Sequence, residues 1–116
     1  MITAENLINI PLMQDPKFHV TQEYLKERMI YKKGKMYWKT YKGNSEYWNG
    51  RYAGKQVGTY SPSRKNHGTL LKGHAYAVHR LVWIYHNGPI SKADRVLHYK
   101  DSTDDSIENL YLIKRG

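Results

Sequence analysis

A histidine and an asparagine in the last third of the chain have the residue types and spacing needed for chemistry on a phosphate ester. His98 ends the stretch Val-Leu-His, and Asn109 follows eleven positions later, beyond a polar, acid-rich segment. Histidine suits a general base because its unperturbed pKa lies near neutrality. An asparagine oxygen can bind a hard divalent ion, with water and phosphate oxygens completing the shell. The pair can therefore supply a base and a metal ligand to one phosphate.

These residues also have ordinary structural interpretations. His98 can be a half-buried strand histidine, and Asn109 can bond local carbonyl groups at the end of a short helix. His79 begins an apolar helix, which favours packing over a supporting role beside the site. The other histidines show no zinc-binding spacing, and there is no cysteine to complete a tetrahedral site. Those residues are His19, His67, His74 and His86.

The charge of the chain points to a polyanionic partner. The net charge is +9, and residues 31–80 hold eleven Lys or Arg against a single acid, Glu46. A basic surface attracts nucleic acid at long range and gains affinity by releasing counterions from phosphates. Tyrosine and tryptophan are interleaved with these charges, which favours a nucleic-acid partner over a merely soluble basic surface.

The size of the chain indicates one domain of 116 residues. No apolar run approaches the ~20 residues that span a bilayer, and the N-terminus lacks the features of a signal peptide. We therefore expect no membrane partner and a cytoplasmic location. Residues 1–20 are interpreted as an N-terminal arm, because Pro11 and Pro16 interrupt any periodicity.

Four local patterns precede the His98 region. Residues 21–29 predict a short helix with Thr21 as its N-cap. Residues 30–39 predict a hairpin turning at Gly34. The glycine-rich residues 42–67 predict loops with one short strand near 51–57. Residues 68–71 and 75–78 predict a second hairpin across Lys72-Gly73.

The pattern changes to a helical period at Val78. Val78, Leu81, Val82 and Tyr85 share one helical face, and Gly88-Pro89 ends the helix. Residues 95–99 predict a strand and residues 101–104 a turn. Asp104 or Asp105 is expected to cap a short helix over residues 106–110.

The order of these motifs resembles that of HNH endonucleases of the phage and homing type, within the ββα-metal nucleases. The resemblance runs from Thr21 onward and includes residues 34–39, Ala53-Gly54, residues 76–83 around His79-Arg80, Gly88-Pro89, Val96-Leu-His98 and Ile107-Glu-Asn-Leu110. It implies an α+β fold in which residues 21–75 form a basic, β-rich DNA-docking region and residues 76–116 form the HNH motif.

The resemblance also implies site residues and a cofactor. It makes His98 the catalytic general base and Asn109 a ligand of a divalent ion, Mg²⁺ in first place and Mn²⁺ in second. Many relatives have an aspartate ligand directly before the histidine, where this chain has Leu97. Asp101 either replaces that carboxylate or caps its own turn.

Double-stranded DNA is the expected partner. Most basic contacts should go to phosphate and carry no sequence information. Residues 61–67 are the candidate groove-entering loop. The candidate DNA contacts are Lys32, Lys33, Lys35, Lys39, Lys42, Arg51, Lys55, Arg64, Lys65, Lys72 and Arg80.

Two other functions compete with the endonuclease. A DNA-binding regulator or inhibitor on an inactive HNH scaffold would explain Leu97. An RNA-binding module would use Tyr37, Trp38, Tyr41 and Trp48 as stacking platforms.

A single site would nick one strand, whereas a double-strand break requires a homodimer or two events. The sequence leaves monomer and homodimer open.

Overall fold

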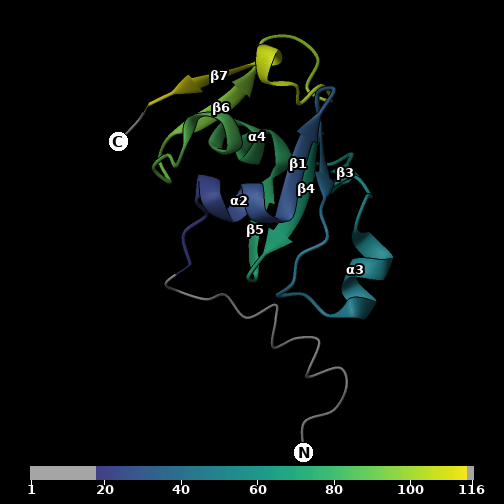
Figure 1. Cartoon of the computed structure of the whole chain (residues 1–116). Coiled ribbons are helices and arrows are strands. Elements are labelled where there is room, and N and C mark those ends of the chain that lie inside the picture. Colours follow the sequence, from purple (N-terminus) through teal and green to yellow (C-terminus); the bar gives the residue numbers. More distant parts are fainter. Residues whose placement is uncertain (1–17, 115–116) are drawn as a thin grey trace, which may run out of the picture.

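The protein has a mixed α+β fold built from short elements (Figure 1). The computed structural model describes residues 18–114. Within that range no helix has the length and apolar character needed to cross a membrane. The predicted arm, residues 1–20, lies largely outside the described residues. The elements are α2 (Gln22–Arg28), β1 (Met29–Lys32), β2 (Lys35–Trp38), α3 (Glu46–Tyr52), β3 (Thr59–Ser61), β4 (Asn66–Leu71), β5 (His74–Ala77), α4 (Val78–Asn87), β6 (Arg95–His98), η1 (Ile107–Asn109) and β7 (Leu110–Ile113).

The first helix and hairpin form where the sequence predicted them. The Thr21 hydroxyl accepts a hydrogen bond from the Tyr24 N–H at 3.1 Å and caps α2, whose Leu25 is fully buried. β1 and β2 pair antiparallel and turn at Lys33-Gly34. Both turn residues have positive φ, 50° and 81°. Positive φ at both positions is typical of the two-residue turn whose twist matches that of a hairpin.

The middle of the chain contradicts the prediction of loops with one strand near 51–57. Residues 46–52 instead form α3, capped by the Ser45 hydroxyl, which accepts from the Trp48 N–H at 3.1 Å. The Trp48 ring packs edge-on against Trp38 with centroids 5.1 Å apart. This tertiary contact and the cap outweigh the low helix propensity of Gly50. Within the predicted strand, residues 54–57 pair with β2 through an isolated bridge between Tyr37 and Gln56 and three backbone hydrogen bonds, without forming a regular strand.

β3, β4 and β5 form an antiparallel sheet that leads into the longest helix of the described chain. The β4–β5 hairpin turns at Lys72-Gly73, as predicted. α4 follows without a break, and the buried residues Val78, Leu81 and Val82 confirm the predicted helical face. Tyr85, the fourth predicted member, is only partly buried, whereas Ile84 is buried and was not predicted. Gly88 ends the helix with a φ of 91°, a conformation that favours glycine.

The last hairpin is formed by β6 and β7, joined by a long connection and η1. β6 confirms the predicted strand, and β7 was not predicted. The predicted aspartate cap is wrong, because Ser106 takes the N-cap position of η1. Asp104 instead accepts from the Ser106 N–H at 3.0 Å, and Asp105 turns its carboxylate toward His98.

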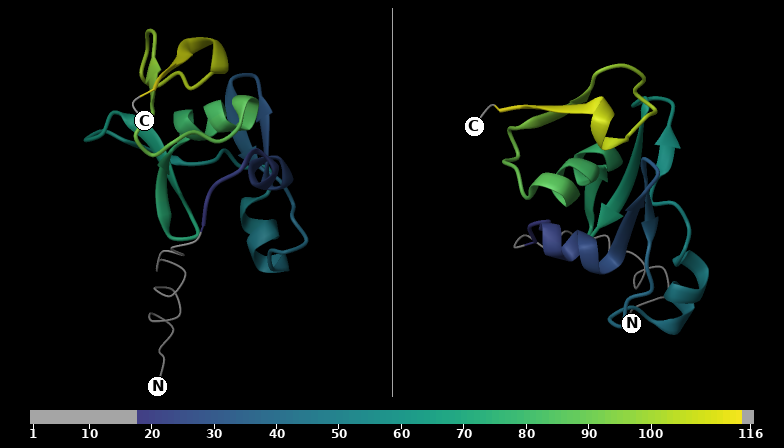
Figure 2. Two further views of the ribbon diagram at one scale, coloured as in Figure 1. Left: turned by 90° about the vertical axis from the view of Figure 1, so that its left-hand side faces the viewer. Right: turned by 45° about the horizontal axis from the view of Figure 1, so that its top comes forward.

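The core lies around α4, which contacts α2, β4, β5 and β6. Figure 2 shows the β6–β7 hairpin beside α4, with the 99–106 connection curving toward the β1–β2 turn. That approach is fixed by the Ile107 N–H, which donates to the Tyr31 hydroxyl oxygen at 3.1 Å. The packing therefore brings the connection and the ends of α4, β4 and β6 into one region.

Candidate active site

His98 is held by an aspartate that lies seven residues further along the chain. Its Nε2 lies 2.8 Å from Asp105 Oδ1, and the two side chains are only 10% and 8% exposed. His98 ends β6, whereas Asp105 lies in the connection just before η1. A buried carboxylate requires a donor or cation to remain charged. The pair is therefore a fixed imidazole–carboxylate arrangement.

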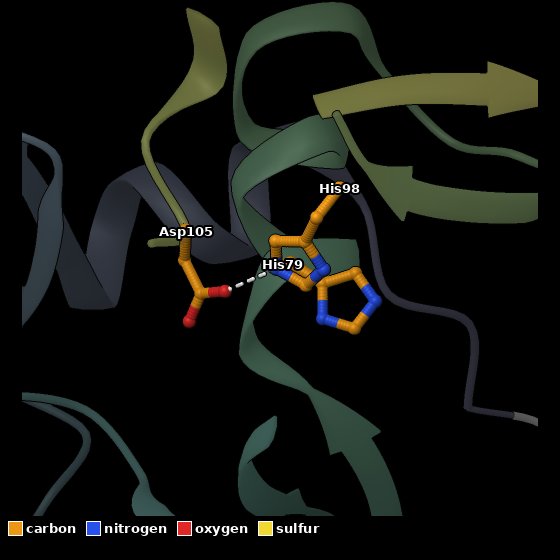
Figure 3. Close-up of side chains that lie close together, drawn as sticks. All are labelled: His79, His98 and Asp105. Carbon is orange, nitrogen blue, oxygen red and sulfur yellow. Dashed lines mark hydrogen bonds and ion pairs between the residues drawn. The ribbon is translucent and has the colours of Figure 1, made fainter. Parts of the chain in front are cut away.

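A second imidazole, from the first turn of α4, lies against this pair (Figure 3). The ring centroids of His79 and His98 are 4.4 Å apart. His79 Nδ1 is buried and has no hydrogen-bond partner. Burial of the ring is the larger cause that lowers the pKa of His79 below its usual range, and the nearby His98 lowers it further. His79 therefore keeps a neutral ring and an unused nitrogen at the site.

His67 reaches the same carboxylate from β4. Its Nδ1 lies 3.3 Å from Asp105 Oδ2, at ion-pair distance. The alignment falls short of a hydrogen bond, so Nδ1 is buried without a hydrogen-bond partner. Asp105 therefore lies between histidines from two different sheets.

The cluster has a donor set that fits a divalent metal ion. One ligand atom each from His79, His98 and Asp105 lie within 4.8 Å of one another. The unpaired His79 nitrogen is the kind of atom that a metal satisfies. Imidazole suits first-row transition metals, whereas Mg²⁺ prefers oxygen ligands. The cluster offers both kinds of donor, and the identity of the ion stays a prediction.

Asn109 is buried and fully engaged with the connection that carries Asp105. Its amide nitrogen donates to the carbonyls of Asp101 at 2.9 Å and Asp104 at 2.8 Å. Its side-chain oxygen accepts from the Lys100 N–H at 3.1 Å. These contacts support the structural alternative for Asn109. The metal-ligand role of Asn109 stays a prediction, and none of these contacts supports it.

Asp101 uses its carboxylate in its own turn. One oxygen accepts from both the N–H and the hydroxyl of Thr103, at 2.8 and 2.7 Å. These bonds hold the pKa of the Asp101 carboxyl below its usual range. The geometry matches the turn-capping alternative and leaves the ligand role a prediction.

Arg80 binds the protein's own backbone. Its guanidinium donates to the carbonyls of Asp94 and Ser91, both at 2.6 Å. Burial holds the pKa of Arg80 below its usual range, although the group remains a cation at neutral pH. Arg80 therefore holds the connection between α4 and β6. It also lines the groove described next, so its DNA contact stays a prediction.

A basic groove of about 540 Å³ opens beside the histidine cluster. His79 and His98 line it, together with the exposed cations Arg64, Lys65, Lys92 and Arg95. The acid in its lining, Asp94, is buried and accepts a hydrogen bond from the Ser91 N–H at 3.1 Å. Positive charge on both walls makes the groove suitable for an anionic strand.

Apart from Arg80, the other predicted DNA contacts lie away from this groove. Lys33 and Lys35 line a separate hollow of about 880 Å³ beside the β1–β2 turn. The Lys39 amine donates to the Lys26 carbonyl at 3.0 Å, and the Arg51 guanidinium donates to the Tyr47 hydroxyl at 3.0 Å. The remaining members are exposed: Lys32, Lys42, Lys55 and Lys72.

Two members of the cluster were not predicted from the sequence. Asp105 was interpreted as a helix cap, and His67 was set aside because it lacks zinc-binding spacing. A faint signal existed for Asp105, since it lies in the acid-rich segment between His98 and Asn109. No local signal marks His67, because β4 and β6 are far apart in sequence.

Comparison with known proteins defines the class. Residues 76–116 match the family model described as HNH endonuclease. The C-terminal part of the chain is therefore an HNH domain, which confirms the predicted resemblance and the α+β fold. The match indicates nuclease activity in general and implies DNA as the substrate. Searches of the curated proteins and of the solved structures gave no match.

Proposed function

We propose that the protein is a metal-dependent endonuclease of the phage and homing HNH type that hydrolyses phosphodiester bonds in duplex DNA. The observation that carries this proposal is the 2.8 Å contact between His98 Nε2 and Asp105 Oδ1, beside a groove lined with cations. The match of residues 76–116 to HNH endonucleases supports the same chemistry.

His98 acts as the general base. Asp105 accepts the Nε2 proton, so this hydrogen bond favours the tautomer whose Nδ1 carries a lone pair. Nδ1 takes a proton from the attacking water as the new P–O bond forms. The bond to the leaving 3′-oxygen breaks, and that oxygen takes up a proton from solvent. A fixed carboxylate stabilises the imidazolium that results.

Asp105 and His79 are the residues that would hold the divalent ion. Asp105 replaces the carboxylate that Leu97 cannot provide, and His79 offers its unpaired Nδ1. When bound, such an ion stabilises negative charge on the phosphate and on the leaving oxygen. In this proposal Asn109 and Asp101 shape the connection and do not bind the ion.

The groove holds the DNA backbone. Arg64 and Lys65 extend from the β3–β4 turn on one side, and Lys92 and Arg95 flank the start of β6 on the other. These cations neutralise phosphates and place one of them beside His98. Their contacts orient the strand without reading its sequence.

A plasmid-nicking assay tests the proposal. Supercoiled plasmid is incubated with the protein and Mn²⁺, Mg²⁺ or chelator, beside His98→Ala and the control His19→Ala, which changes an exposed histidine. We expect metal-dependent open circles with the wild type and the control, with higher activity in Mn²⁺. His98→Ala should lose about 10²–10⁴-fold in rate, the usual contribution of a general base.

The alternative is a DNA-binding protein on an inactive HNH scaffold. Leu97 and the backbone contacts of Asn109 favour it, because Leu97 cannot bind a metal and the Asn109 side chain is already bonded to the connection. Equal gel shifts by the wild type and His98→Ala, with intact plasmid in every metal, would support this alternative and refute the nuclease.

A further inference from the structure

We propose that His67 is a positioning residue that fixes His98 by holding Asp105 from the opposite side. The proposal deepens the proposed function and rests on it where catalysis is concerned. The structural link itself can be tested without any cleavage of DNA.

The carboxylate of Asp105 depends on two imidazoles. It is 8% exposed, and among residues 18–114 the imidazoles within ion-pair distance of it are His98, at Oδ1, and His67, at Oδ2. No lysine or arginine in that range pairs with it. A buried carboxylate with one side unsupported can rotate or draw in water to satisfy its free oxygen. His67 therefore limits the orientations open to Asp105.

His67 acts from outside the substrate groove. It lines the 880 Å³ hollow beside the β1–β2 turn, together with Asp105, whereas His79 and His98 line the groove. Asp105 therefore lies on the side of the hollow with His67, while its other contact, His98, lines the groove. Because His67 does not line the groove, its effect on the reaction must pass through Asp105.

The position of His67 also connects the site to the proposed DNA contacts. His67 lies on β4, two residues after Lys65, in the strand that leaves the turn carrying Arg64 and Lys65. Its ring packs edge-on against Tyr60, the partner residue on β3, with centroids 5.3 Å apart. The strand that presents two groove cations therefore also supports the carboxylate behind the base.

The main test is His67→Phe, which keeps an aromatic ring and removes the nitrogen. We expect kcat to fall by about 10–100-fold, the usual effect of losing a partner behind a site residue, with KM unchanged. His67→Asn keeps an N–H donor and should restore much of the loss. The control His74→Phe changes a histidine on β5 that packs against Phe18 instead.

A second readout needs no activity. Nitrogen NMR of the metal-free protein at one fixed pH reports which nitrogen of His98 carries the proton. We expect Nε2–H in the wild type, His67→Asn and His74→Phe, and a mixture of tautomers in His67→Phe. Should His67→Phe fail to fold, His67→Ala is used, because it leaves open a hollow that already exists.

The two proposals fail in different ways. Wild-type kcat and an unchanged His98 tautomer in His67→Phe would overturn the positioning role and leave the nuclease intact. If the wild type cuts no DNA, the nuclease is refuted, and the NMR measurement alone decides whether His67 fixes Asp105 and His98.

Discussion

At the scale of single residues, His79 is a histidine whose charge the fold disfavours. The pKa of His79 in the folded protein lies below the ordinary histidine value of 6.5 because the ring is buried beside His98. The unfolded chain therefore binds more protons in this range, and stability should begin to fall as the pH drops below about 6.5. The loss ends once the pH passes below the folded pKa. NMR titration in chelator should give a midpoint under 6.5; a midpoint at or above it would contradict the burial argument.

Asn109 gives a second prediction at this scale. Replacing it with alanine removes the partner of two carbonyls and one N–H in the connection. We expect Asn109→Ala to lower the free energy of unfolding by about 1–3 kcal/mol, the cost of leaving buried polar groups unpaired. Denaturant unfolding in chelator measures it. A residue that serves only as a metal ligand would show no loss under those conditions.

At the scale of elements, Arg80 fixes the segment between α4 and β6. Arg80→Lys keeps the charge, but a single amine cannot replace the two guanidinium nitrogens that donate to the Asp94 and Ser91 carbonyls. We expect it to lower the unfolding free energy by about 1–3 kcal/mol. The salt dependence of DNA binding should stay as in the wild type. An unchanged unfolding free energy in Arg80→Lys would contradict the structural role of Arg80.

The elements that sequence predicts here are those that local signals determine. Thr21 caps α2, Gly34 and Lys72-Gly73 turn two hairpins, and the apolar period from Val78 gives α4. α3 was missed because its stability depends on Trp48 packing against Trp38, a contact with another element.

The residues of the candidate site also divide into one that the sequence indicates and others that only the packed fold brings together. The family pattern singled out His98, and the structure places it in the histidine–aspartate cluster. Asp105 and His67 meet it only after β4, β6 and the connection have packed together. Such partners depend on tertiary structure, so residue spacing cannot reveal them.

At the scale of the whole molecule, a net charge of +9 should make DNA binding strongly salt-dependent. If about six phosphates are neutralised, log affinity should fall with log salt with a slope of about −5. The double change Lys92→Ala/Arg95→Ala should weaken that slope by about 2. The matched pair Lys39→Ala/Arg51→Ala removes the same charge from groups already bonded to protein oxygens, and should change it less. Equal changes of the salt slope in the two double variants, measured by fluorescence titration, would refute the groove as the DNA-binding surface.

Three hairpin tips carry lysines with positive φ, a backbone conformation that costs lysine conformational energy. Lys33, Lys65 and Lys72 have φ values of 50°, 57° and 52°. Lys33→Asn and Lys72→Asn create the Asn-Gly sequence favoured in such turns and should each raise the unfolding free energy by up to about 1 kcal/mol. Thermal melts would detect it, and a lower melting temperature would contradict it. Lysine at these tips thus exchanges folding stability for outward positive charge, so variants selected for heat resistance alone should lose it there.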